Sequence, residues 1–119
     1  MTQAAKNYLV QVAAIIKTVK PERHIYRKRE DYYAASDIAA YADIDWLSQL
    51  TDEDLKELRS RPALMECWEC GRTDSLIRLT KQGWEAAHDF ACEIIAEHDA
   101  ECHNPEYGSF WERALWLVD

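Results

Sequence analysis

One short stretch of β character lies between helical segments, and this order limits the fold more than any other feature of the sequence. Residues 63–70 and 75–79 are short runs with strand character, and the Gly-Arg-Thr-Asp segment between them can turn tightly. The sequence on either side has the three-and-four spacing of apolar residues that is typical of helices. We therefore expect a mainly α fold with one small β-hairpin.

The N-terminal third of the chain predicts one long helix followed by a segment without a clear period. Apolar residues recur on one helix face over residues 3–19, with Thr2 as a suitable N-cap and Pro21 as a terminator. Residues 20–35 mix charged residues with tyrosine. They fit a loop, a short strand around residues 24–27, or the approach to a second helix, and the sequence leaves these three alternatives open.

The middle of the chain predicts two or three short helices. Ser36 is a suitable N-cap for a helix over residues 37–43. Residues 45–61 place their apolar side chains toward a core, but Thr51 and Asp54 resemble a capping box. These residues therefore form either one continuous helix or two helices with a break before Thr51.

Two more helices are expected after the hairpin. The helical period returns at Thr80 and continues to Asn104-Pro105, which predicts the longest helix of the chain. Ser109 and Glu112 resemble a second capping box, and they open a short, very apolar C-terminal helix.

Length and composition favour one domain inside the cell. With 119 residues, of which 48% are hydrophobic, the chain is large enough to form one continuous core over residues 1–119. It has no signal-peptide pattern and no apolar run of about 18 residues, so we expect a cytoplasmic protein without a membrane partner. We expect the four cysteines to be reduced, because a domain this apolar needs no disulfides.

Charge is divided unevenly along the chain. Residues 1–29 contain seven Lys or Arg and one acid, a balance of +6, whereas residues 30–119 contain seven basic residues and 21 acids, a balance of −14. An acidic surface repels the phosphates of duplex DNA. Any nucleic-acid contact should therefore involve the N-terminal basic stretch or isolated arginines.

Two motifs resemble parts of winged-helix domains. Residues 36–44, SDIAAYADI, look like the start of a helix-turn-helix, and residues 77–85, IRLTKQGWE, resemble the end of the wing in MarR- and PadR-type regulators. In such a motif Thr80 would cap the next helix, and Gly83 would let the first turn of that helix approach the sheet. The resemblance implies a winged-helix core over about residues 36–90, with flanking helices at about 3–19 and 80–118.

The helix that would read DNA in this resemblance has acids near its start. A helix that enters the major groove needs donors such as Arg, Asn, Gln or Lys there, whereas carboxylates repel phosphates. We therefore expect a protein partner. The candidate protein-binding residues are acids of this helix together with apolar residues near the C-terminus: Asp45, Asp52, Glu53, Asp54, Glu57, Phe110, Trp111 and Trp116.

A second hypothesis keeps nucleic acid as the partner. The N-terminal basic run could follow a phosphate backbone, and an arginine at the wing tip could enter a minor groove. The same basic run is also explained as a solvated loop that balances an acidic body. The candidate nucleic-acid-binding residues are Lys20, Arg23, Arg27, Lys28, Arg29, Arg72 and Arg78.

The sequence gives only weak signals for a metal site. Cys67 and Cys70 form a C-x-x-C-G motif, which is half of a zinc knuckle, and His98, Cys102 or His103 could complete four ligands. A second C-x-x-C is missing, and cysteines are ordinary small core residues. We therefore expect neither a metal ion nor any other cofactor.

Catalysis is not expected either. His88, Asp89 and Cys92 fall within one helical turn, but a long acidic helix produces such neighbours by chance. The chain has no glycine-rich phosphate loop and no nucleophile elbow. These observations predict a protein that binds and does not catalyse.

The C-terminal helix predicts self-association. Its aromatic and aliphatic residues surround the helix almost completely, so one core-facing stripe does not cover them. We expect a homodimer built mainly from the first helix and the C-terminal segment, although packing of that segment against the first helix is nearly as well supported.

The leading hypothesis is thus a small regulatory or inhibitory protein that binds another protein through an acidic winged-helix scaffold. The alternative is a dimeric DNA-binding transcription regulator.

Overall fold

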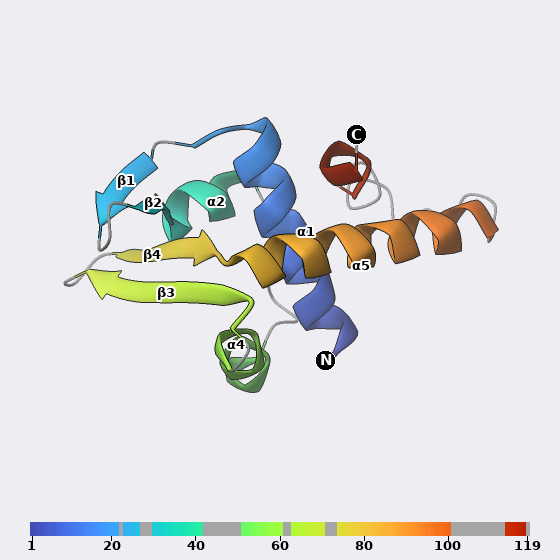
Figure 1. Ribbon diagram of the computed structural model, residues 1–119, viewed down its shortest axis with the longest axis horizontal. Helices are drawn as coiled ribbons and strands as arrows, with labels where there is room; N and C mark the ends of the chain where they lie inside the picture. Colours follow the sequence, from blue (N-terminus) through green and yellow to red (C-terminus); the bar gives the residue numbers. More distant parts are fainter. Residues whose placement is uncertain are drawn as a thin grey trace.

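The computed structural model describes residues 1–21, 23–26, 30–41, 51–60, 63–70, 74–100 and 114–118. In chain order, these residues contain α1 (Gln3–Thr18), β1 (Arg23–Tyr26), β2 (Glu30–Ala34), α2 (Ala35–Tyr41), α4 (Asp52–Arg59), β3 (Met65–Cys70), β4 (Asp74–Leu79) and α5 (Lys81–Ala100), and residues 114–118 form a further helical segment (Figure 1). The fold is mainly helical with a small antiparallel sheet, as the sequence predicts.

The sheet contains the predicted hairpin and a second hairpin beside it. β3 pairs with β4 from Met65↔Leu79 to Cys70↔Asp74, which confirms the predicted hairpin. β1 pairs with β2, so the described residues 23–26 and 30–34 of the segment that the sequence left open form strands. The pairing Tyr33↔Ile77 joins β2 to β4, and the strand order is β1-β2-β4-β3. The sheet is therefore larger than the single hairpin that the sequence predicts.

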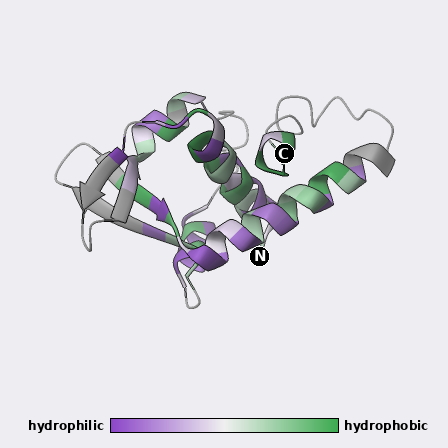
Figure 2. Ribbon diagram, turned by 45° about the horizontal axis from the view of Figure 1, so that its top comes forward, coloured by the Kyte–Doolittle hydropathy of each residue, from purple (hydrophilic) through white to green (hydrophobic). Residues whose placement is uncertain are grey.

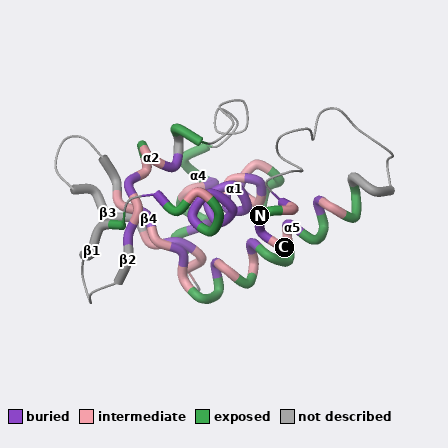
Figure 3. The backbone as a smooth tube through the Cα atoms, turned by 90° about the horizontal axis from the view of Figure 1, so that it is seen from above, coloured by how far each residue is buried: buried purple, intermediate pink, exposed green. Residues whose placement is uncertain are grey.

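α1 lies in the centre of the molecule (Figures 1 and 3). Every residue from Leu9 to Ile16 is buried, and the helix packs against α2, α4 and α5. The sequence of this stretch, LVQVAAII, is apolar on nearly all sides, and a helix that is apolar all round must be enclosed (Figure 2). α1 therefore shares one hydrophobic core with residues of the 36–90 segment.

Two N-caps connect α1 to α4. The Thr2 hydroxyl accepts a hydrogen bond from the Ala5 amide at 3.2 Å and donates one to Asp54 Oδ1 at 2.6 Å. Thr51 and Asp54 form a complete capping box at the start of α4. Both predicted caps are confirmed, and a helix does begin after Thr51, while residues 42–50 lie outside the described part.

The predicted cap of the second helix is wrong. α2 begins at Ala35, directly after the last residue of β2, so Ser36 lies inside the first turn and not at the N-cap. The physical reason is that the strand runs directly into the helix. Since β2 is held by pairing with β1 and β4, the sheet determines where the helix begins.

The start of α5 packs closely against the chain just before β3. The Thr80 hydroxyl accepts a hydrogen bond from the Gly83 amide at 3.0 Å and donates one to the Ala63 carbonyl at 2.6 Å. A Cβ atom on Gly83 would lie 1.9 Å from the Leu64 carbonyl oxygen. The predicted cap and the predicted close approach of the helix to the sheet are both confirmed.

The C-terminal segment packs against α1. Ala114 and Leu117 belong to the buried core, and Lys17 Nζ donates to the Leu117 carbonyl at 2.9 Å. Trp116 remains 37% exposed. The alternative prediction, that this segment packs against α1, is confirmed, while the homodimer stays a prediction. Residues 101–113, which include the predicted cap at Ser109, lie outside the described part.

Candidate functional site

The predicted acidic residues of α4 have different environments. Asp52 and Glu53 are exposed in the first turn of the helix. Glu57 is also exposed, and its carboxylate lies 3.1 Å from the N-terminal ammonium group of Met1. Asp45 lies outside the described residues. Asp52 and Glu53 therefore remain as exposed carboxylates that form no ion pair with another described residue.

Asp54 has a structural role. It is only 4% exposed, and its carboxylate accepts hydrogen bonds from the Thr2 hydroxyl at 2.6 Å and from the Thr51 amide at 3.1 Å. The Thr2 hydrogen bond, followed by that of the Thr51 amide, lowers the pKa of Asp54 below its ordinary value. The buried carboxylate connects α4 to the N-terminus of α1. Asp54 is therefore not exposed for contact with a partner, although the sequence analysis names it as a protein-binding candidate.

A second acidic surface, which the sequence analysis missed, follows α5. We call it the α5 acidic stripe, and it consists of Glu85, Asp89, Glu93 and Glu97, all exposed. Residues four apart lie on the same side of a helix, so the four carboxylates form one row along its outer face. The i, i+4 spacing of the acids was visible in the sequence and was the signal for this surface.

In the described part of the chain, Lys6 offsets some of the repulsion within the α5 acidic stripe. Lys6 Nζ lies 3.8 Å from the Glu93 carboxylate and also 5.1 Å from the centre of the Phe90 ring. Each like-charge pair at i, i+4 costs a helix about 0.2–0.5 kcal/mol. The stripe contains three such pairs, so its arrangement is not explained by the stability of α5.

The predicted nucleic-acid-binding residues do not form one surface in the described part of the chain. Lys20 and Arg23 are exposed where α1 ends and β1 begins. Arg78 is half-buried on β4, and it pairs with Glu66 of β3 at 3.5 Å. The remaining candidates, Arg27, Lys28, Arg29 and Arg72, lie outside the described residues, as do Phe110 and Trp111 among the protein-binding candidates.

The residues that the sequence analysis weighs for catalysis or metal binding lie on α5 and on β3. His88 and Cys92 are exposed on α5, with 3.8 Å between the imidazole Nδ1 and the thiol sulfur. Cys67 and Cys70 both belong to β3, where an extended backbone separates positions i and i+3 by about 10 Å. Within the described ranges, no three His, Cys, Asp or Glu side chains are grouped so that they could hold a metal ion.

Comparison with known proteins gives no relative from which a function could be transferred. No protein-family model, curated protein or solved structure matches this chain. Among the described helices, none has both the length and the apolar composition needed to cross a membrane. The described residues and their contacts are therefore the basis for a functional proposal.

Proposed function

We propose that this chain is a small, non-enzymatic regulatory protein of winged-helix type, and that it binds a partner protein with a basic surface. The partner contacts the α5 acidic stripe together with Asp52 and Glu53 of α4. The observation that carries this proposal is the stripe of four exposed carboxylates at i, i+4 spacing.

The pairing of the strands supports the winged-helix part of the proposal. β2 precedes α2 and α4 in the chain, and it pairs with β4, the second strand of the hairpin that follows these helices. The two helices are thus connected at both ends to one sheet. The cap at Thr80 and the close contact at Gly83 also fit the wing-end motif that the sequence resembles.

Electrostatics support a protein partner. The chain has a net charge of −8, and the exposed carboxylates of Asp52 and Glu53 lie in the first turn of α4, the part that contacts bases when a helix of this type reads DNA. Phosphates would be repelled there, whereas Lys and Arg side chains of a protein would be attracted. A basic partner would also relieve the repulsion between neighbouring carboxylates on α5.

Capture of the partner from cells that naturally contain the protein tests the proposal. The tagged wild-type chain is compared with Asp89→Lys on α5 and with Glu53→Lys on α4. We expect a specific protein to be captured by the wild type and lost with either variant. Ala40→Lys, a positive charge added at an exposed position of α2, is the control and should retain the partner.

The stability of the α5 variant separates loss of binding from loss of folding. Asp89→Lys replaces two like-charge contacts, with Glu85 and Glu93, by two opposite-charge contacts. The free energy of unfolding should therefore rise by about 1 kcal/mol while the partner is lost. Retention of the partner by a well-folded Asp89→Lys protein would contradict the proposed role of the stripe.

A further inference from the structure

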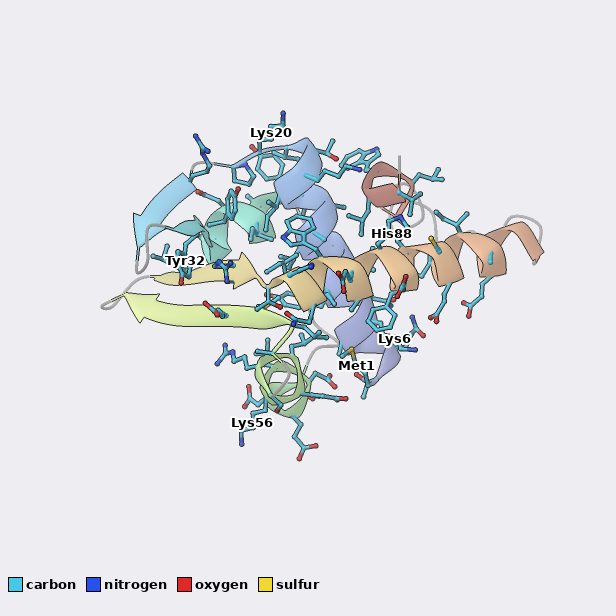
Figure 4. All side chains as sticks on the ribbon, in the orientation of Figure 1. Met1, Lys6, Lys20, Tyr32, Lys56 and His88 are labelled. Carbon is cyan, nitrogen blue, oxygen red and sulfur yellow. The ribbon has the colours of Figure 1, made fainter. Side chains whose placement is uncertain are left out.

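A pocket of about 690 Å³ lies where the C-terminal end of α1 meets the sheet and the start of α5. Its described lining residues come from α1, the connection after it, β1, β2 and α5: Ile16, Lys17, Lys20, Pro21, Arg23, Tyr33 and Trp84. The volume falls within the range of pockets that bind small molecules in proteins. Figure 4 shows Lys20 at the end of α1 opposite Met1, so the pocket is far from the α4 acids.

The lining residues divide into an apolar part, an aromatic part and a cationic part. Ile16 and Pro21 are buried, and the aromatic side chains of Tyr33 and Trp84 are half-buried. The cationic residues Lys17, Lys20 and Arg23 are exposed. A pocket with buried apolar residues and an exposed cationic rim fits a ligand that has a flat apolar part and a negatively charged group.

The described lining of the pocket has a charge opposite to that of the whole chain. All three charged residues among the described lining residues are basic, although the chain has 22 acids against 14 Lys and Arg. An anionic group that enters the cavity would be attracted by all three of these side chains. Their gathering from α1, from the connection after it and from β1 therefore favours an anionic ligand.

The position of the lysines at the end of a helix explains only part of this arrangement. Lys17 lies in the last turn of α1, where a cation interacts favourably with the helix dipole, and it donates to the Leu117 carbonyl at 2.9 Å. That contact uses one of the three donors of the ammonium group. Arg23 belongs to β1, so the helix end does not account for it.

We propose that this pocket binds a small aromatic anion, with the ring between Tyr33 and Trp84 and the anionic group at Lys17, Lys20 and Arg23. A carboxylate and a phosphate are both suitable anionic groups, because ammonium and guanidinium groups bind either one through charge-assisted hydrogen bonds. The site is far from the α4 acids and lies at the start of α5, and none of its described lining residues belongs to the proposed partner-binding surface.

Isothermal titration calorimetry with defined probes tests this proposal. The anionic probes are naphthoate, an aromatic carboxylate, and AMP, an aromatic phosphate, and the neutral probes are naphthamide and adenosine. We expect one molecule of at least one anionic probe to bind per chain, more weakly as salt is added and at least about tenfold more tightly than its neutral counterpart. The tighter of the two anions identifies the preferred anionic group.

Lys20 allows a variant that separates binding from folding. Its φ angle is 54°, in the left-handed region that glycine adopts without strain. Lys20→Gly should therefore weaken binding about tenfold, the effect of losing one charge-assisted hydrogen bond, while the Tm does not fall. Lys81→Ala removes an exposed lysine of α5 that does not line the pocket, so it should leave the affinity unchanged.

Trp84→Leu tests the aromatic part of the site. Leucine keeps an apolar side chain at this half-buried position but cannot stack on a ring, so binding should weaken while the protein remains folded. Three results would overturn the proposal. They are no binding of either anion below about 1 mM, equal binding of the neutral probes, and full affinity in the Lys20→Gly protein.

Discussion

Replacing Gly83 by alanine should destabilise the protein, although the same change in most helices is favourable. Alanine is better than glycine in a helix by about 1 kcal/mol. At this position, however, the new Cβ atom would lie 1.9 Å from the Leu64 carbonyl oxygen, which also accepts a hydrogen bond from the Thr80 amide at 3.2 Å. Since C···O contacts are normally about 3.3 Å or longer, α5 would have to move by more than about 1 Å relative to β3.

The size of the effect follows from these opposing contributions. Overpacking costs about 1–3 kcal/mol, and loss of the Thr80–Leu64 hydrogen bond costs about 1 kcal/mol more. After subtraction of the gain in helix propensity, we expect a net loss of about 2 kcal/mol, or roughly 8 °C in Tm. Urea unfolding and thermal melting of Gly83→Ala measure both quantities.

The neighbouring exposed residue provides the control. Gln82→Ala should change the free energy of unfolding by no more than about 0.5 kcal/mol, because its side chain is exposed. An unchanged or higher Tm for Gly83→Ala would refute the reasoning. It would mean that the contact between α5 and the residue before β3 is not close, and the structural support for the wing-end motif would be lost.

Two further predictions concern acid stability and self-association. Because the pKa of Asp54 is lowered, its carboxylate stabilises the fold above the unfolded-state pKa of about 3.9, and this contribution is lost as the pH falls through the folded-state value. Asp54→Asn should therefore reduce the fall in Tm below about pH 5 that the wild type shows in thermal melts, whereas an unchanged profile would contradict this role. We also propose that the exposed face of Trp116 contacts a second copy of the chain, so that Trp116→Ala shifts a dimer toward monomer in light scattering. A wild-type mass near 13.9 kDa at high micromolar concentration would contradict the dimer.

Local signals in the sequence predicted the beginnings of helices and the main hairpin. A cap depends on a few neighbouring residues, so Thr2, Thr51 and Thr80 could each be identified without knowledge of the fold. The central position of α1 is also visible in the sequence, since LVQVAAII is apolar on nearly all sides of the helix.

Features that depend on distant residues could not be predicted. β1 and β2 lie in a sequence of mixed charges and tyrosines. Their strand structure depends on the pairing of β1 with β2 and of β2 with β4. The pocket likewise combines Lys20 and Arg23 with Trp84, which is more than sixty positions away in the chain. The sequence assigned these two cations to a nucleic-acid surface because only the neighbouring basic residues were apparent.

Titration of a fluorescently labelled mixed-sequence DNA duplex with the protein tests the central claim most directly. Fluorescence anisotropy at about 50 mM salt favours any phosphate contact, because such contacts weaken as salt is added. We predict no saturable binding, since the exposed acids of α4 and α5 repel the duplex. Tight, salt-sensitive and sequence-selective binding that Arg23→Glu abolishes would contradict the proposal of a protein partner and would favour a DNA-binding regulator.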